Sequence, residues 1–112
     1  RLNITRSIFR GNVVNGSAVS TFYNGSLSMY KSCLEGNSNI DGSLTPGIVF
    51  VQESSALVRN EDNFGSNNTV NGSDCVDIFL QGSSGSTCID FDAVECLADR
   101  PYVPTASPRP TL

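Results

Sequence analysis

The stretch that decides the fold, Leu2 to Asn12 (LNITRSIFRGN), lies at the start of the chain and recurs at a period of about 25 residues. It lies over Leu27 to Asn37 (LSMYKSCLEGN) without a gap, with identical Leu, Ser, Gly and Asn positions. Sequence self-similarity at periods of roughly 20–50 residues is typical of repeat proteins, in which every copy forms one layer of a stack. The repeat therefore predicts stacked layers, each one repeat long.

A third copy is more degenerate. The stretch Leu57 to Asn67 (LVRNEDNFGSN) follows at a period of 30, begins with leucine, ends with asparagine and places Phe64 under Phe9 and Leu34. It departs from the other copies at Arg59 and Asn63. The departures predict either a β-bulge or a register shifted by one residue.

A second series of apolar runs lies between these copies. The runs open at Ala18 and Val19, at Ile48 and Val49, and at Cys75 and Val76. Alternate residues of a strand share one face, so stacking predicts inward columns of like residues. The predicted columns are Val19 over Val49 over Val76, and Thr21 over Val51 over Ile78.

Asparagine and glycine are expected at the corners between strands. Both residues tolerate the left-handed backbone region that tight corners often need. Asn12, Asn37 and Asn67 recur at one such corner, where stacked side chains could bond the backbone of the neighbouring layer. Helices are not expected over residues 1–80, because no 3.6-residue apolar stripe persists there.

Composition excludes several functions. The 112-residue chain contains no histidine, so neither a histidine-based catalytic triad nor a histidine metal site can form. A net charge of -4 argues against nucleic acid or an anionic membrane as the partner. No apolar run approaches a length of about 18 residues, so no membrane span is predicted.

Three features favour an extracellular or cell-surface location. Lysine occurs once, as Lys31, and the even cysteine set could form two disulfides in any of three pairings: Cys33, Cys75, Cys88 and Cys96. Their spacing gives zinc little support. Five tripeptides match the N-glycosylation pattern: Asn3, Asn15, Asn24, Asn67 and Asn71.

The spacing of serine, an aromatic residue or leucine, glycine and asparagine resembles the right-handed parallel β-helix repeats of the pectate-lyase-like superfamily. The resemblance covers about residues 2–91 and is closest to extracellular, non-enzymatic members. It implies an all-β solenoid of about three coils, expected to be part of a longer one because Arg1 lies inside a repeat. A Greek-key β-sandwich is the alternative, since many short strands with Gly, Asn and Ser turns fit it too.

Two regions are expected along the chain. Residues 1–96 would form the β-helix coils with a cysteine-rich C-terminal cap, tied down by disulfides. Residues 97–112, with Pro101, Pro104, Pro108 and Pro110, are expected to be an extended tail or linker.

Acidic residues offer the only visible chemistry. Asp74 with Asp77, and Asp90 with Asp92, are spaced so that either pair could act as acid and base or hold calcium. Acidic residues at such spacings are more common on solvated strand faces and at turns. We therefore predict no catalytic residue, no metal site and no cofactor, with calcium as the ion that these pairs could hold.

The outward face of the second series carries the candidate recognition surface. If Val19 and Val49 point inward, then Phe22, Phe50 and Phe79 point outward, with Asp77 beside them. Exposed aromatic rings stack on sugars or pack against a partner protein. A covering loop, or an inverted register that buries these rings, is the alternative.

These observations favour a non-catalytic module of a secreted or cell-surface glycoprotein. The expected partners are a polysaccharide, a glycoprotein, or further copies of the chain through open β-helix ends. Two alternatives stay open: the C-terminal part of a polysaccharide lyase, hydrolase or epimerase, and a secreted β-sandwich lectin or effector.

Overall fold

The computed structural model describes residues 1–99, which contain thirteen strands and no helix. The prediction of an all-β fold is confirmed. Residues 100–112, which hold most of the expected tail, lie outside the described residues.

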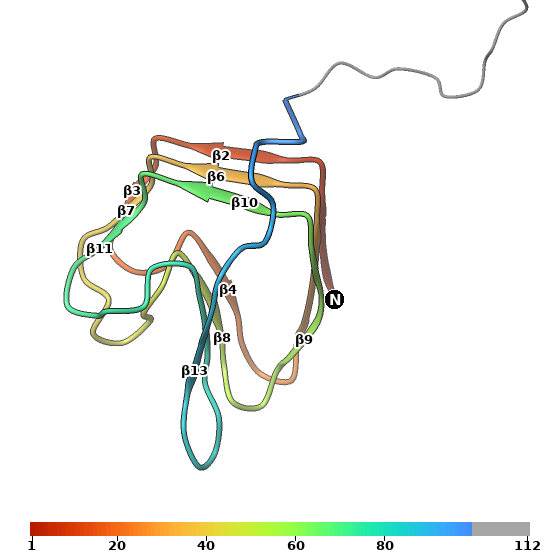
Figure 1. Cartoon of the computed structure of the whole chain (residues 1–112). Helices are drawn as coiled ribbons and strands as arrows, with labels where there is room; N and C mark the ends of the chain where they lie inside the picture. The colour runs from red at the N-terminus through yellow and green to blue at the C-terminus, as the bar shows by residue number, and fades with distance from the viewer. Residues whose placement is uncertain (100–112) are drawn as a thin grey trace, which may run out of the picture.

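The chain passes through four sheets in the same order three times (Figure 1). Sheet A contains β1 (Leu2–Thr5), β5 (Ser26–Tyr30) and β9 (Ala56–Glu61), and sheet B contains β2 (Ile8–Arg10), β6 (Cys33–Glu35) and β10 (Phe64–Ser66). Sheet C contains β3 (Val13–Val14), β7 (Ser38–Asn39) and β11 (Thr69–Val70). Sheet D contains β4 (Val19–Thr21), β8 (Val49–Val51), β12 (Ile78–Leu80) and β13 (Thr87–Ile89). Each passage through the four sheets is called a layer below.

Sheets A, B and C are wholly parallel, and sheet D is parallel except for the antiparallel pairing of β13 with β12. Leu2 pairs with Leu27 and Ile8 with Cys33, so the repeat read from the sequence is the register of the first two layers. Parallel pairing of layers distinguishes this arrangement from the antiparallel sheets of a Greek-key sandwich.

A β-bulge in β9 explains why the third copy looked degenerate. Leu27 pairs with Leu57, but Ser28 pairs with Arg59, so Val58 is an extra residue that lies 54% exposed. Every later residue of that copy is displaced by one position, and Phe64 pairs with Cys33 instead of Leu34. The predicted position of Phe64 was therefore wrong, and the bulge is the physical reason.

The third member of the predicted asparagine column also changes, from Asn67 to Asn68. The Oδ1 of Asn37 accepts the backbone N–H of Asn12, and the Oδ1 of Asn68 accepts that of Asn37, at 3.0 and 2.9 Å. Asn67 instead occupies the corner position of Gly11 and Gly36, and all three have a left-handed backbone. The expected ladder exists, but with the next asparagine along the chain.

The third strand of the second series is displaced by two residues. Val49 pairs with Ile78 and Val51 with Leu80, so the predicted positions of Val76 under Val49 and of Ile78 under Val51 were wrong. Since a shift of two residues keeps the same face inward, the apolar alternation alone could not reveal it.

The apolar core lies inside the stack and is densest in the middle layer. Leu27, Met29 and Leu34 are fully buried there, as are Val49 and Val51. In contrast, Leu2, which pairs with Leu27 in the first layer, is 41% exposed. Burying a side chain of this size contributes roughly 1.5–3 kcal/mol, so a middle layer with neighbours on both sides contributes most.

The asparagine ladder generates a stability prediction. Replacing Asn37 with alanine leaves the N–H of Asn12 and the carbonyl of Phe9 without their side-chain partner. An unpaired group costs about 1–3 kcal/mol when it is buried and less when it is partly exposed, as the N–H of Asn12 is, so we expect Asn37→Ala to lower the free energy of unfolding by about 2 kcal/mol. Asn12→Ala, at the exposed end of the same ladder, should cost less than half as much in urea titrations. Equal losses in the two variants would contradict this role of the ladder.

Candidate functional site

Sheet D brings the three predicted phenylalanines together. Phe50 pairs with Phe79 and with Ser20, and Phe22 follows directly after β4. The ring centroids of Phe50 and Phe79 lie 6.0 Å apart and nearly parallel, and those of Phe22 and Phe50 lie 5.6 Å apart. The three rings thus form one aromatic ladder across the layers, at spacings typical of favourable ring pairs.

The ladder is exposed mainly at its first-layer end. Phe50 is 2% exposed and Phe79 is half-buried, whereas Phe22 is 39% exposed. Tyr23, whose ring centroid lies 6.0 Å from that of Phe22, is 85% exposed. The rings that a ligand can reach are therefore those of Phe22 and Tyr23, at the turn from sheet D to sheet A.

Glutamines continue this turn through the next two layers. The side-chain oxygen of Gln52 accepts the backbone N–H of Tyr23, and that of Gln81 accepts the N–H of Glu53, at 2.8 and 3.1 Å. Beside them lies an open groove of about 450 Å³, lined by Gln52, Glu53, Ser54, Gln81 and Ser83. An exposed aromatic pair next to a polar groove suits a ligand with both apolar faces and hydroxyl groups. Among the residues of this turn and groove, Phe22 is the one that the sequence analysis assigned to the recognition surface. The hydrogen bonds of Gln52 and Gln81 depend on the stacking of layers, so no sequence motif marks them.

Two residues of the candidate acidic pairs form hydrogen bonds that hold the segment after β13 against the stack. A carboxylate oxygen of Asp77 accepts the N–H of Phe91, and one of Asp92 accepts the N–H of Asn63. Partial burial raises the pKa of Asp77 above its ordinary value, the N–H of Phe91 opposes this, and the charge of Asp90 adds to it. Asp74 is exposed. Two of the four carboxylates thus hold backbone groups in place.

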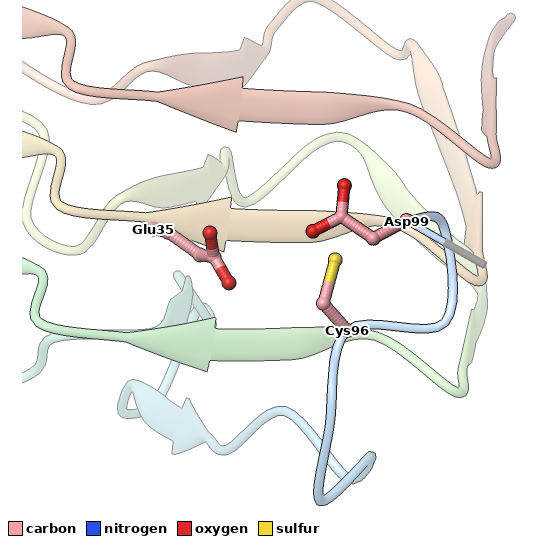
Figure 2. A group of neighbouring side chains, drawn as sticks. All are labelled: Glu35, Cys96 and Asp99. Atoms are coloured by element: carbon pink, nitrogen blue, oxygen red, sulfur yellow. The ribbon is translucent and has the colours of Figure 1, made fainter.

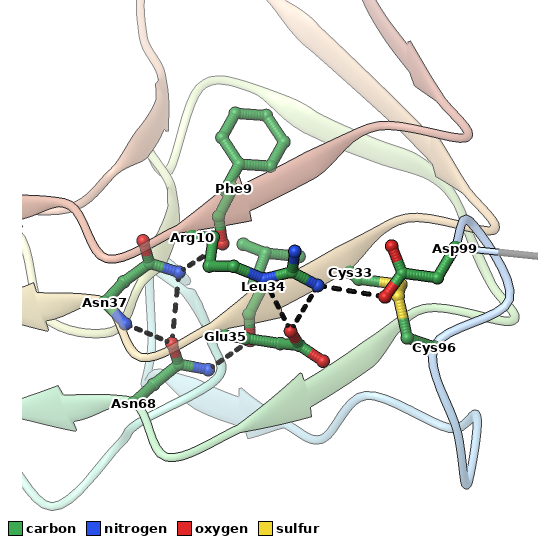
Figure 3. A network of polar contacts seen from close by, with 9 residues as sticks. All are labelled: Phe9, Arg10, Cys33, Leu34, Glu35, Asn37, Asn68, Cys96 and Asp99. Atoms are coloured by element: carbon green, nitrogen blue, oxygen red, sulfur yellow. Dashed lines mark hydrogen bonds and ion pairs between the residues drawn. A yellow bond between two sulfur atoms is a disulfide. The ribbon is translucent and has the colours of Figure 1, made fainter.

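Glu35, Cys96 and Asp99 lie together on the outer side of sheet B, in a group that resembles a metal site by proximity (Figure 2). Cys96 is bonded to Cys33, so its sulfur is not the thiolate that binds metals. The guanidinium of Arg10 bridges the two carboxylates, at 2.7 Å from Glu35 and 2.9 Å from Asp99 (Figure 3). Hydrogen bonds and ion pairs with Glu35 and Asp99 raise the pKa of Arg10. The guanidinium of Arg10 therefore already neutralises these carboxylates. The group, called the Arg10 clamp below, joins the segment after β13 to sheet B.

The four predicted cysteines form two disulfides, Cys33 with Cys96 and Cys75 with Cys88. The first ties the segment after β13 to the middle strand of sheet B, over which that segment passes (Figure 1). Gly65 leaves room there, since a Cβ at this position would clash with the ring of Phe91. Disulfides persist in oxidising environments, so the pair is consistent with a secreted or extracellular protein.

All five asparagines of the glycosylation motifs are exposed. Asn24 adjoins Tyr23, and Asn15 borders a second hollow of about 270 Å³ beside Asp41 and Leu44. Hydrogen bonds from Ser43 lower the pKa of Asp41 and hold this loop. Attached glycans would thus project from the turns of the stack and, at Asn3, from strand β1 of sheet A.

Comparison with protein-family models, with curated proteins and with solved structures finds no match. Within residues 1–99, no helix is long and apolar enough to cross a membrane.

The disulfides should contribute unequally to stability. They close loops with sequence separations of 63 and 13 residues, and chain entropy favours the longer loop. We expect the pair of substitutions Cys33→Ala and Cys96→Ala to cost about 4 kcal/mol, against about 3 kcal/mol for Cys75→Ala and Cys88→Ala. Guanidinium unfolding of both double variants measures the difference, and the reverse order would show that loop length does not govern the effect.

The raised pKa of Asp77 predicts a pH dependence. A carboxyl group with a raised pKa stabilises the fold most below its unfolded pKa, and this contribution is lost as pH rises through the folded pKa. The amide introduced by Asp77→Asn cannot ionise but keeps an oxygen for the N–H of Phe91. The melting temperature of Asp77→Asn relative to wild type should therefore increase between about pH 3 and pH 7. A difference independent of pH would refute the assignment; Asp74→Asn, at an exposed carboxyl, is the control.

Proposed function

We propose that this chain is a non-catalytic, right-handed parallel β-helix module of an extracellular or cell-surface glycoprotein. In this proposal it binds uncharged glycan chains at the turns from sheet D to sheet A. The observation that carries the proposal is the exposed aromatic pair Phe22 and Tyr23 beside the polar groove. Aromatic rings pack against the apolar faces of sugars while polar side chains bond the hydroxyl groups.

The site suits binding more than chemistry. Glutamine and serine dominate the groove lining, and Glu53 is its single ionisable residue. A lone carboxylate without a second acid or base nearby does not provide the pair that glycoside hydrolysis requires. Its negative charge also disfavours acidic polysaccharides, so uncharged chains are the better ligands for this groove.

The repeat itself supports a structural role. Backbone-to-side-chain bonds join the layers at their corners. One disulfide ties the segment after β13 to sheet B, and the other joins β13 to the loop before β12. Such a scaffold places the same turn at a constant position in each layer, which allows a chain-like ligand to contact several layers at once.

The proposal is tested with protein secreted from a eukaryotic host and screened against uncharged polysaccharides, before and after enzymatic removal of N-glycans. We expect binding that Tyr23→Asn weakens at least tenfold, because the substitution removes the ring and asparagine tolerates the left-handed backbone there. Treated and untreated samples are compared because a glycan on Asn24 would adjoin Tyr23.

The matched control is Leu44→Asn, which replaces another exposed apolar side chain on a different turn. It should leave the affinity within twofold of wild type. Absence of binding by folded, deglycosylated wild type would refute glycan recognition at this turn, as would equal losses in the two variants.

A further inference from the structure

Basic residues are concentrated on one side of the stack. Residues 1–99 contain five of them, and Arg10 is engaged in its clamp with Glu35 and Asp99. The other four belong to sheet A or to residues that directly adjoin its strands: Arg1, Arg6, Lys31 and Arg59. Against them stand two acidic residues of the same region, Glu61 and Asp62. The remainder of the described chain carries one basic and nine acidic residues.

These basic residues lie on or beside the outward face of sheet A. Ile4, Leu27 and Met29 point into the core, so the alternate residues of these strands face outward. Tyr30 is one of them, and its ring has the guanidinium of Arg59 at 3.8 Å and the Nζ of Lys31 at 5.2 Å from its centroid. Cation–π contacts of this kind hold two cations close together in spite of their repulsion.

The acidic neighbours neutralise only part of the charge. Glu61 forms an ion pair with Arg59, and Asp62 occupies the corner position equivalent to Lys31 and Arg6. Arg1 and Arg6 are exposed, and the region keeps an excess of two positive charges. On an acidic protein, an excess of this sign on one face raises the local concentration of anions there.

We propose that the outer face of sheet A binds a polyanionic glycan, at a site separate from the groove that binds uncharged glycans. Arginine and lysine bind anionic oxygens strongly, and Tyr30 already restrains two of the cations, which lowers the entropy cost of binding. Asn3, Thr5 and Ser28 add polar groups on the same face for sugar hydroxyls.

The dimensions of the face favour a single glycan chain over a nucleic acid duplex. Sheet A has three strands, so its outer strands lie only about 10 Å apart. Loops and the segment after β13 carry most of the acidic residues of the described chain, and this negative charge repels a wide polyanion more than a narrow one that stays on sheet A. The disulfides are also consistent with an extracellular environment, where polyanionic glycans are present.

The test uses protein from a bacterial periplasm, which forms disulfides and leaves Asn3 without a glycan. Dextran sulfate is the probe, and uncharged dextran of the same length controls for the sugar backbone. We expect calorimetric titration to show binding of dextran sulfate that weakens as the salt concentration rises. Any binding of uncharged dextran should be the same for wild type and for variants of sheet A. The double variant Lys31→Gln, Arg59→Gln should bind dextran sulfate at least tenfold more weakly.

Two variants make the result specific. Arg10→Gln removes the same kind of charge from sheet B and should change the affinity less than twofold, while Lys31→Arg with Arg59→Lys should retain binding. The proposal fails if folded wild type does not bind dextran sulfate, or if Arg10→Gln loses as much as the double variant. It also fails if duplex DNA binds as tightly. Because Tyr23 lies outside this face, binding of uncharged glycans should persist in the double variant, so failures of the two proposals are distinguishable.

Discussion

One hydrogen-bonding rule holds the stack together. At each corner, a backbone N–H of one layer donates to a side-chain oxygen of the next layer. Between sheets A and B, Ser7 donates to Ser32 and Ser32 donates to Asn63. At the other three corners the bonds are Asn12 to Asn37 between B and C, Gly16 to Asn39 between C and D, and Tyr23 to Gln52 between D and A. Corners turn the backbone away from its strand ladder, so these amides would otherwise lie without partners. The polar composition of the chain is thus a requirement of the fold, and the apolar columns between the corners can stack only because the corners are satisfied.

The same rule explains how the third layer ends. Within residues 1–99 no fourth repeat follows, and the carboxylate of Asp92 accepts the N–H of Asn63 where a stacked side chain would otherwise do so. The next residue, Ala93, donates its N–H to the carbonyl of Asn63, so the segment after β13 continues the ladder without forming another layer. The disulfide from Cys96 to Cys33 and the Arg10 clamp then fix this segment across sheet B. Open strand edges invite pairing with other chains, and this arrangement covers part of such an edge.

The strand pairing could be predicted from the sequence where the repeat is regular. It could not be predicted where single residues break the repeat or change its register. Through sheets A, B and C the first two layers are in register without insertions, so this pairing could be predicted from the sequence repeat alone. A β-bulge was one of the two predicted explanations for the third copy and is confirmed, but the extra residue could not be identified as Val58, because an extra residue and a substituted one look alike in a degenerate copy. The two-residue error at Ile78 had a different origin, since both registers bury the same face. The burial of Phe50 was not predictable either: whether an outward ring is covered depends on how its neighbours pack.

Stacking also determines where a function can reside. A position that repeats in every layer becomes a column on the surface, and identical charges in a column repel each other at the strand spacing of about 4.8 Å. The corner column Arg6, Lys31 and Asp62 breaks such a run with an acidic residue, whereas Tyr30 offers its ring to both Lys31 and Arg59 and so offsets their repulsion. Residues that only maintain the stack recur as asparagine, serine or glutamine, and they give no clue to a ligand. The informative positions are those where the layers differ, as at Tyr23 and Arg59, because neither residue is required by the repeat.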